Sequence, residues 1–227
     1  MVYVMSDIHG CYDKYIKILK KISFSKEDTL YILGDVVDRG PHGMKVLLDI
    51  AKRENVILLR GNHDQQAGIL LSALDKLNDE NCSKELIEVY KMWLSDGGKT
   101  TLVEYLKLTD DEQKKVLQML KKTILSKEIT VNGNTFLLAH TVPEVDIICD
   151  YETWGLEEFI LGEPDYEEVY FDGKYIVTGH TPTYYIDKTS NGKIWKGNHH
   201  IAIDCGAVFG NALGCVCLDT LEEFYVM

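Results

Sequence analysis

The sequence predicts an α/β fold in which strands and helices alternate through the first part of the chain. Three observations predict it. Apolar β-forming runs alternate with helical repeats over 1–64, helical spacing dominates 65–128, and strand-like runs separated by turn signals fill the remainder. The 227 residues, 45% hydrophobic and 26% charged, are typical of one globular domain covering 1–227.

The first 64 residues contain three expected strands, at 2–5, 29–33 and 55–59, and two expected helices, over about 11–22 and from Pro41 to Ala51. Proline suits the first position of a helix, and the apolar residues that follow Pro41 recur at i, i+3, i+4 and i+7. This βαβαβ order predicts three neighbouring parallel strands joined by right-handed crossovers.

A helical excursion is expected at about 65–128, with helices at Ile69–Leu77, Lys84–Leu94 and Asp110–Lys122. Thr109 and Glu112 form a capping-box pattern at the start of the last helix, whereas Gly97-Gly98 interrupts the helical run before it. We expect this excursion to overhang the site described below rather than to form an independent domain.

The second half of the chain is β-rich. Asn132-Gly133 is a hairpin signal between two apolar runs, and Asn191-Gly192 indicates a second hairpin. The final strands are expected at 200–203, 214–218 and 222–226.

The charge and the cysteines exclude several classes of protein. A formal net charge of −12 argues against a nucleic-acid partner or an anionic membrane surface, and no apolar run approaches the roughly 20 residues that span a bilayer. The amino terminus is expected to be a strand rather than a signal peptide, which favours a cytoplasmic protein. The six cysteines form no C-x-x-C pair, and Cys215 and Cys217 are expected to pack on one face of a strand.

Polar side chains follow five expected strands, at 2–5, 30–33, 55–59, 136–139 and 175–178, at the point where each strand ends. They are Asp7, His9, Asp35, Asn62, His63, His140 and His180. One such histidine is unremarkable, but carboxylates, imidazoles and an amide oxygen arriving from five strands are the ligand set for two divalent transition ions. Manganese is favoured, with iron, zinc or nickel as alternatives. Arg39 and Arg60 add positive charge, and metals with arginines indicate a phosphate-binding pocket.

The ordered motifs resemble the calcineurin-like metallophosphoesterases, and within them the bacterial and phage serine/threonine phosphoprotein phosphatases. The motifs are Asp7-x-His9, Gly34-Asp-x-x-Asp-Arg-Gly40, Gly61-Asn-His-Asp64, His140 and Gly179-His-Thr-Pro182, with 7–12, 93–98 and 203–210. The resemblance covers nearly the whole chain. It implies a central β-sandwich flanked by helices, which adds the β-rich second half to the parallel sheet.

The resemblance also implies a role for each residue. Asp7, His9 and Asp35 would hold one metal, and Asp35 would bridge to a second metal held by Asn62, His140 and His180. His63 would be the general acid, oriented by Asp38, while Arg39 and Arg60 would contact phosphoryl oxygens. Two such metals can share a water and lower its pKa, so that hydroxide can attack phosphorus.

Three positions depart from the pattern of the family. Asp64 stands where glutamate is usual, and Cys205 stands where threonine is frequent, so its thiol is expected either near the site or, preferably, buried and inert. Leu156 stands where related bacterial enzymes often have an arginine that binds phosphate. Either one phosphate contact is missing, or Arg53 or a lysine replaces it.

The favoured hypothesis is a metal-dependent phosphatase that acts on phosphoserine, phosphothreonine or phosphotyrosine residues of proteins. The first alternative is a symmetrical diadenosine tetraphosphate hydrolase or another small-molecule phosphoesterase, and the second is a non-catalytic metal-binding module. The acidic residues near 157–158 and 165–168 oppose a polyanionic nucleotide and favour phosphoproteins. Oligomeric state and regulation are not indicated by the sequence.

Overall fold

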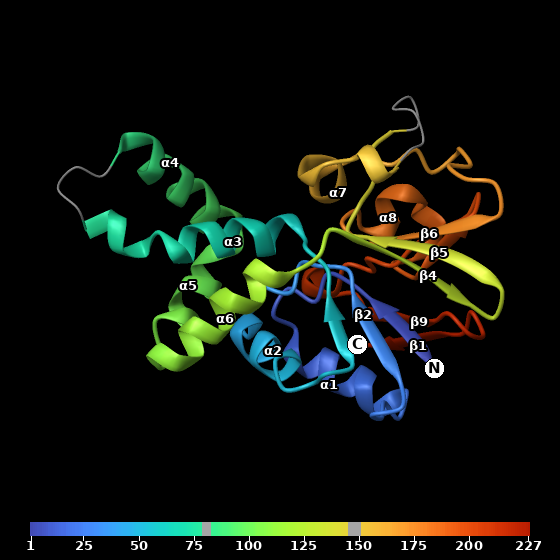
Figure 1. Cartoon of the computed structure of the whole chain (residues 1–227), viewed down its shortest axis with the longest axis horizontal. Helices are drawn as coiled ribbons and strands as arrows, with labels where there is room; N and C mark the ends of the chain where they lie inside the picture. The colour runs from blue at the N-terminus through green and yellow to red at the C-terminus, as the bar shows by residue number, and fades with distance from the viewer. Residues whose placement is uncertain (79–82, 145–150) are drawn as a thin grey trace.

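Two five-stranded sheets stack face to face in the computed structural model, which describes residues 1–78, 83–144 and 151–227 (Figure 1). The first sheet has the order β10-β9-β1-β2-β3. Its strands are β1 (Val2–Met5), β2 (Thr29–Ile32), β3 (Val56–Leu58), β9 (Leu213–Cys217) and β10 (Glu223–Val226). The second sheet has the order β4-β5-β6-β8-β7. Its strands are β4 (Ser126–Val131), β5 (Asn134–Ala139), β6 (Lys174–Thr178), β7 (Trp195–Gly197) and β8 (His200–Ala202). The expected sandwich is confirmed.

The βαβαβ unit forms the parallel part of the first sheet. β1 pairs with β2 and β2 pairs with β3, both in parallel, with Val2 opposite Thr29 and Leu30 opposite Val56. The expected neighbouring parallel strands are therefore confirmed. β9 adds to the free edge of β1 in the antiparallel direction, so residues near the end of the chain complete the sheet that begins at its start.

One of the two predicted hairpins is confirmed and the other is wrong. Asn132 and Gly133 both have positive φ, 49° and 83°, and join β4 to β5 as an antiparallel pair. Asn191-Gly192 instead follows a short 3-10 helix (η4, Lys188–Ser190) and connects no two strands. The hairpin between β7 and β8 turns at Asn198 and His199, which both adopt left-handed backbone conformations. The two turn residues are thus Asn-His rather than the Asn-Gly pair by which the hairpins were predicted.

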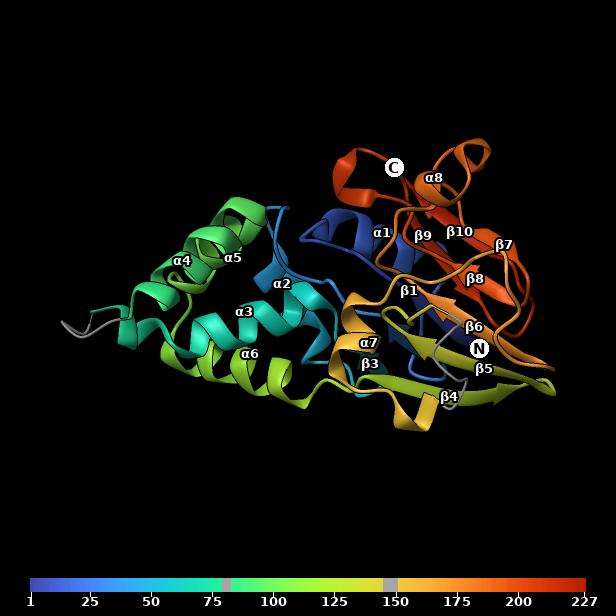
Figure 2. The same ribbon diagram turned by 90° about the horizontal axis from the view of Figure 1, so that it is seen from above.

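Helices cover the outer faces of the sandwich and extend beyond one end of it (Figure 2). They are α1 (Tyr12–Lys21), α2 (Gly43–Ile50), α3 (Asn62–Ser72), α4 (Lys84–Trp93), α5 (Lys99–Tyr105), α6 (Asp110–Lys122), α7 (Leu156–Leu161) and α8 (Thr183–Ile186). Short helical turns are η1 (Leu74–Asn78), η2 (Leu94–Gly98), η3 (Tyr151–Thr153) and η5 (Ala207–Phe209). Within the described residues, none of these helices has the length and apolar character needed to cross a membrane.

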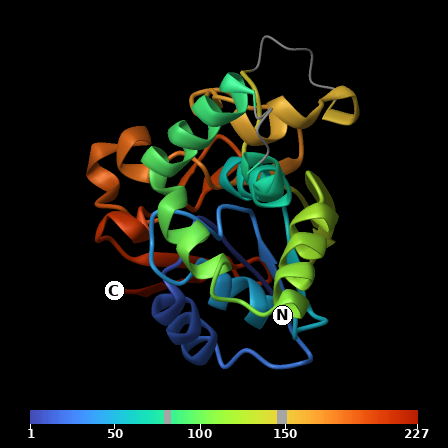
Figure 3. The same ribbon diagram turned by 90° about the vertical axis from the view of Figure 1, so that its left-hand side faces the viewer.

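The helical excursion has a different internal organisation from the predicted one. α3 starts at Asn62 rather than Ile69, because the Asp64 carboxylate accepts the N–H of Gly61 and caps the helix. Gly97-Gly98 interrupts the helical run as predicted, because Gly97 has a non-helical φ of +106° and kinks the chain between α4 and α5. The additional helix α5, which begins at Lys99 directly after the kink, was not predicted. The capping box of Thr109 and Glu112 is present at α6. Figure 3 views this group of helices end-on, in front of the sheets.

Pro41 does not open α2 as predicted. The helix begins at Gly43, with His42 as its N-cap residue, because the N–H of His42 donates to the Gly10 carbonyl and ties this loop to the turn after β1. The two loops that follow β1 and β2 are thereby joined before the helix starts.

Alternate side chains of each strand point to opposite faces of the sheet, so they pack in different layers of the core. Val4 and Val216 face inward and pack with residues of β5, β6 and β8 between the sheets. Their strand neighbours Met5, Cys215 and Cys217 face outward, where they pack with α1 and α2. The expectation that the two cysteines share one buried face is confirmed, whereas Cys82 and Cys149 lie outside the described residues.

We expect Phe136→Ala to lower the free energy of unfolding by about 3–5 kcal/mol, because Phe136 is fully buried between the two sheets. Urea unfolding followed by circular dichroism measures this change, with Phe136→Leu as a control that should lose considerably less. A loss below about 1 kcal/mol for the alanine variant would contradict the assignment of this layer as the central core.

Candidate metal and phosphate site

The predicted polar residues lie immediately after five strands whose carboxyl ends meet at one edge of the sandwich. Asp7 and His9 follow β1, and Asp35 follows β2; the remaining positions are Asn62 and His63 after β3, His140 after β5 and His180 after β6. β1, β2 and β3 are parallel within the first sheet, and β5 and β6 are parallel within the second. Side chains from both sheets therefore converge on the same edge.

Backbone turns in an uncommon conformation present these side chains. Twelve non-glycine residues of the described chain have left-handed φ values, between 42° and 67°, and six of them belong to the site: Asp7, His9, Asp35, Asp38, Arg39 and His180. Each such residue costs of order 1–3 kcal/mol, and persists only where the surroundings impose it. Here the chain reverses within one or two residues of a strand end. That reversal turns successive polar side chains toward the edge of the sandwich.

Asp35 lies at the centre of two groups of ligand atoms. One group contains His9, Asp35 and His63, and the other contains Asp35, His140 and His180; within each group the ligand atoms lie within 4.8 Å of one another. The carboxylate Oδ2 of Asp35 is 3.6 Å from Nε2 of both His9 and His140. A carboxylate that belongs to both groups has the position expected of a bridging ligand.

The donor atoms of the second group suit a cation. Nδ1 of His140 donates to the Leu33 carbonyl at 2.7 Å, so its Nε2 carries a lone pair. That lone pair lies 3.0 Å from Oδ1 of Asn62 and 3.1 Å from Nδ1 of His180. Nε2 of His140 and Oδ1 of Asn62 are both acceptors, and two acceptors so close together are unfavourable unless a positive ion lies beside them. The residues present therefore fit a metal ion at this position.

A backbone carbonyl likewise orients His9 in the first group. Nδ1 of His9 lies 2.8 Å from the Val37 carbonyl, which leaves Nε2 facing the cluster. Asp7 adjoins the second group, because its Oδ2 accepts the backbone N–H of His180 at 3.0 Å. All six predicted ligands thus lie in or beside the two groups.

Burial keeps the histidines neutral and so leaves their lone pairs available. It lowers the pKa of His140 to about 3 and that of His180 to about 4, and it also lowers the pKa of His9. Burial, together with the nearby carboxylates of Asp7 and Asp64, raises the pKa of Asp35. A bound cation would favour the ionised form of this carboxylate and offset part of the burial penalty.

His63 is held by the carboxylate of Asp38, which also accepts hydrogen bonds from two other side chains. Its Nδ1 lies 2.8 Å from Oδ2 of Asp38, which also accepts the indole N–H of Trp93 at 2.9 Å. The hydroxyl of Thr101 donates to Oδ1 of Asp38 at 2.6 Å. The predicted pairing of His63 and Asp38 is present. Sequence analysis missed the roles of Trp93 and Thr101, although Trp93 opened one of the recognised motifs.

Arg39 brings a guanidinium to the cluster. Its NH1 lies 2.9 Å from Nε2 of His9, and its NH2 lies 3.5 Å from Asp96. The chain contains three arginines, at positions 39, 53 and 60. Arg39 alone among them contacts the predicted ligands, so phosphate recognition by a guanidinium depends on this residue.

The structure does not bring Arg60 to the cluster as predicted. Its guanidinium donates to the carbonyls of Lys121 and Thr123, to the Thr123 hydroxyl and to the Gln65 side chain. These acceptors surround the carboxyl end of α6, where unpaired carbonyls attract a cation. The guanidinium therefore binds the helix end.

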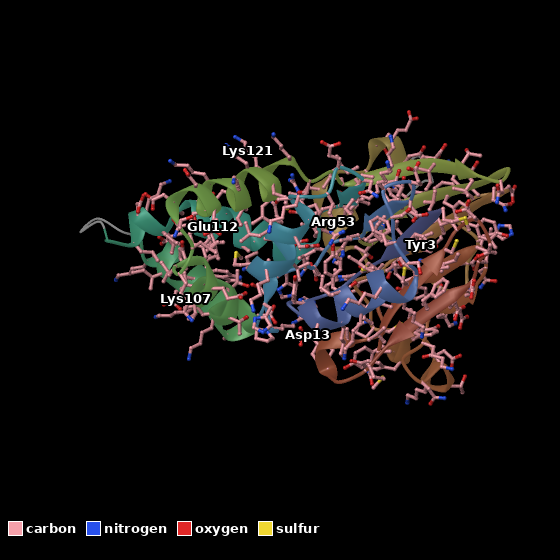
Figure 4. The ribbon with its side chains drawn as sticks, turned by 90° about the horizontal axis from the view of Figure 1, so that it is seen from below. Tyr3, Asp13, Arg53, Lys107, Glu112 and Lys121 are labelled. Atoms are coloured by element: carbon pink, nitrogen blue, oxygen red, sulfur yellow. The ribbon has the colours of Figure 1, made fainter. Side chains whose placement is uncertain are left out.

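Arg53 also cannot replace an arginine at position 156. It forms a two-point ion pair with Asp49 at 2.6 and 3.2 Å, on the face that α1 and α2 cover (Figure 4). Arg53 precedes β3, so it lies at the edge of the sheet opposite the ligands. Leu156 itself starts α7 and packs against the apolar cluster of Trp154 and Phe159.

The other two departures have structural explanations. The Asp64 carboxylate accepts three backbone N–H groups, from Asp35, Val36 and Gly61, at 2.8–3.3 Å. The shorter carboxylate thus fastens the loop after β2 to the start of α3. Cys205 is 2% exposed within the sandwich core, and burial raises the pKa of its thiol. It is therefore buried and unreactive, as preferred from the sequence.

Comparisons with known proteins agree with this geometry. The family model for calcineurin-like phosphoesterases matches residues 1–184. The asymmetrical bis(5'-nucleosyl)-tetraphosphatase PrpE of Bacillus subtilis is 28% identical, and the match covers 92% of this chain and 87% of that protein. The symmetrical enzyme of Wigglesworthia glossinidia brevipalpis is 32% identical, but that match covers 52% of this chain and 43% of the relative.

Solved structures share the fold. A candidate diadenosine tetraphosphatase has a TM-score of 0.68 at 19% identity, with 99% of this chain and 92% of the other covered. A protein serine/threonine phosphatase of Saccharomyces cerevisiae has a TM-score of 0.59 at 15% identity, covering 100% and 80%. These likenesses support the fold and leave the substrate open.

We expect Gly97→Ala to raise KM for a small phosphoester by about 10- to 100-fold. Gly97 has φ +106°, and a Cβ there would lie 2.6 Å from the backbone N and Cγ of Arg39, so Arg39 would have to move. Steady-state kinetics with manganese measures the change. The matched control is Gly133→Ala, which has φ +83° but no atom within 4 Å of its new Cβ. An equal rise of KM in Gly97→Ala and Gly133→Ala would contradict the explanation that the new Cβ at position 97 displaces Arg39.

Proposed function

Because this chain belongs to the calcineurin-like phosphoesterase family, we propose that it is a bis(5'-nucleosyl)-tetraphosphatase that cleaves its substrate asymmetrically. The family and its tetraphosphatase relatives identify a metal-dependent phosphoester hydrolase, which argues against a non-catalytic metal-binding module. The substrate assignment rests on how much of this chain each relative matches. The relatives that match this chain over 92–98% of its length are asymmetrical tetraphosphatases.

The phosphoprotein phosphatase hypothesis stays a prediction that the comparisons do not confirm. Among solved structures, protein phosphatases share the fold at 15–17% identity and a candidate diadenosine tetraphosphatase shares it at 19%, with a higher TM-score. Among the curated relatives, tetraphosphatases match at 27–36% identity. The nucleotide alternative is therefore better supported. The symmetrical relatives match only about half of this chain, so we favour cleavage into a nucleoside monophosphate and a nucleoside triphosphate.

Six residues would hold two divalent cations: Asp7, His9, Asp35, Asn62, His140 and His180. Bound there, such ions would supply Lewis-acid chemistry, lowering the pKa of a water and neutralising charge on phosphoryl oxygens. Manganese remains the favoured ion. The imidazoles make magnesium alone a poor match to the donor set.

The remaining residues bind the phosphate chain and move the proton. Arg39 would donate to a phosphoryl oxygen from its position beside His9. His63, with Nδ1 held by Asp38, would present Nε2 to the leaving oxygen and donate a proton there. A polyphosphate leaving group has a pKa of about 6, so it needs this proton less than a serine alkoxide does.

His63→Asn should lower kcat on phosphoserine by about 10²–10⁴-fold and lower kcat on a dinucleoside tetraphosphate by clearly less, while manganese binding is kept. Parallel kinetics on both substrates, with metal content measured for each preparation, tests the proton-donor role. Near-normal turnover of the phosphoserine ester would rule out His63 as the acid.

Asp35→Asn should weaken manganese binding at both positions, because Asp35 alone belongs to both ligand groups found in the described residues. Calorimetric titration of chelator-treated protein should show two sites in the wild type and at least a tenfold loss of affinity in the variant. Asp49→Asn, a carboxylate change on α2, is the control. A variant that keeps two tight sites would exclude a bridging Asp35.

The proposed function is tested by offering diadenosine tetraphosphate and a mixture of phosphopeptides to the manganese-loaded chain and separating the products by anion exchange. AMP with ATP, abolished by chelator, is the expected result. Two molecules of ADP would indicate symmetrical cleavage. Chelator-sensitive release of phosphate from the peptides without nucleotide cleavage would restore the phosphoprotein hypothesis and overturn the proposal.

A further inference from the structure

Two aromatic side chains are conspicuously exposed beside the ligand cluster. The chain has 13 tyrosines, six phenylalanines and three tryptophans. Among the described residues, only Tyr185 and Phe209 of this set leave a large part of their side chain in water, at 74% and 56% exposure. They are far apart in the sequence, but contacts through Tyr184 and Gly206 connect the segments that carry them.

Phe209 lies directly against the phosphate-binding arginine. The guanidinium carbon of Arg39 is 5.5 Å from the centre of the Phe209 ring, in the range of a cation–π contact. The same guanidinium lies 2.9 Å from Nε2 of His9. One arginine thus connects a candidate metal ligand to an exposed ring.

Tyr185 belongs to α8, whose other tyrosine packs over the loop that carries Phe209. Its ring centre lies 4.5 Å from that of Tyr184, and both belong to α8, which starts three residues after the ligand His180. Tyr184 packs over Gly206, where a Cβ would lie 2.9 Å from its ring. Gly206 directly precedes η5, the turn that ends at Phe209, so α8 and η5 form a continuous rim.

The loop that carries Phe209 is held in one conformation by its glycines and by hydrogen bonds from Lys14. Gly206 and Gly210 flank η5 with left-handed φ values of 76° and 92°. The ammonium of Lys14, from α1, donates to the carbonyls of Ala207 and Asn211 at 2.9 and 2.6 Å. A fixed loop that presents an apolar ring to water is preorganised for a ligand.

Negative charge beside the rim would keep the phosphates of such a ligand away from that side. Tyr185 also lines an adjoining cleft of about 640 Å³ that five carboxylates border: Glu144, Glu163, Asp165, Glu167 and Glu168. This cleft repels phosphate, so an anionic chain is confined to the side of Arg39 and the cations. The uncharged part of the ligand is left for the rings.

We propose that Phe209 and Tyr185 form a stacking platform for a nucleobase of the substrate, while Arg39 binds the adjoining phosphates. The inference rests on the proposed function and names the part of the substrate that this rim recognises. Aromatic rings stack on any base, so the platform would select nucleotides over bare phosphoesters without strong preference among bases.

Equilibrium binding tests the platform without any turnover. The manganese-loaded chain is titrated calorimetrically with α,β-methylene ADP, which carries a base, and with methylenediphosphonate, which does not. In the wild type, Kd should be at least tenfold lower for the nucleotide analogue. Phe209→Leu and Tyr185→Leu should each reduce this ratio by about 5- to 100-fold, as expected for loss of one stacking contact. Kd for methylenediphosphonate should not change.

The control variant is Leu106→Ala, which removes an exposed apolar side chain next to Lys107. Figure 4 shows Lys107 in the group of helices beyond the sheets. This variant should leave Kd unchanged for both the nucleotide analogue and methylenediphosphonate. Unchanged nucleotide affinity in the double variant Phe209→Leu/Tyr185→Leu would overturn the proposal. Equal weakening of both ligands would also overturn it, because the rings would then act only by supporting Arg39.

Separate results distinguish this inference from the proposed function. Base-dependent binding that the double variant loses, in a chain that does not cleave diadenosine tetraphosphate, would support the platform and reject the tetraphosphatase. Cleavage of diadenosine tetraphosphate with no loss of base-dependent binding in the double variant would reject the platform and keep the tetraphosphatase.

Discussion

Buried acceptor atoms that face one another around Asp35 are the constraint on which the rest of the structure depends. Oxygen and nitrogen lone pairs of Asp35, Asn62 and His140 converge within hydrogen-bond distance or slightly beyond it. Left-handed turns and backbone carbonyls hold them there, at a cost in folding free energy. Cation binding would offset that cost, so the stability of the site and its loading with metal are thermodynamically linked.

A second buried carboxylate connects this cluster to the helices that lie beyond the sheets. Asp38 accepts hydrogen bonds from His63, Trp93 and Thr101, which belong to α3, α4 and α5. Removal of any one donor would leave a buried charge less well compensated. The helical segment is therefore part of the site, since it orients the imidazole and, through the carbonyl of Gly97, the backbone of Arg39.

The use of the three arginines bears on the substrate. Arg53 neutralises Asp49 and Arg60 binds the end of α6, so a single guanidinium, that of Arg39, contacts the ligand cluster. With one arginine available, much of the binding energy for a substrate must come from the cations and from surfaces beside the phosphate. The exposed rings of Tyr185 and Phe209 provide such a surface, and this agrees with a nucleotide better than with a bare phosphoester.

Sequence by itself determined most strands, the parallel order of the first three, most helices and the seven polar residues at the strand ends, because period, turn residues and motif spacing are local properties of the chain. It failed where contacts between distant residues decide. Helix α5, which the sequence did not predict, starts directly after the kink at Gly97, whose carbonyl accepts the backbone N–H of Arg39. Arg60 turns from the cluster because Lys121 and Thr123 offer carbonyls. The burial of Cys205 and the exposure of Phe209 likewise depend on which sheets, helices and loops meet, and only the tertiary structure settles that.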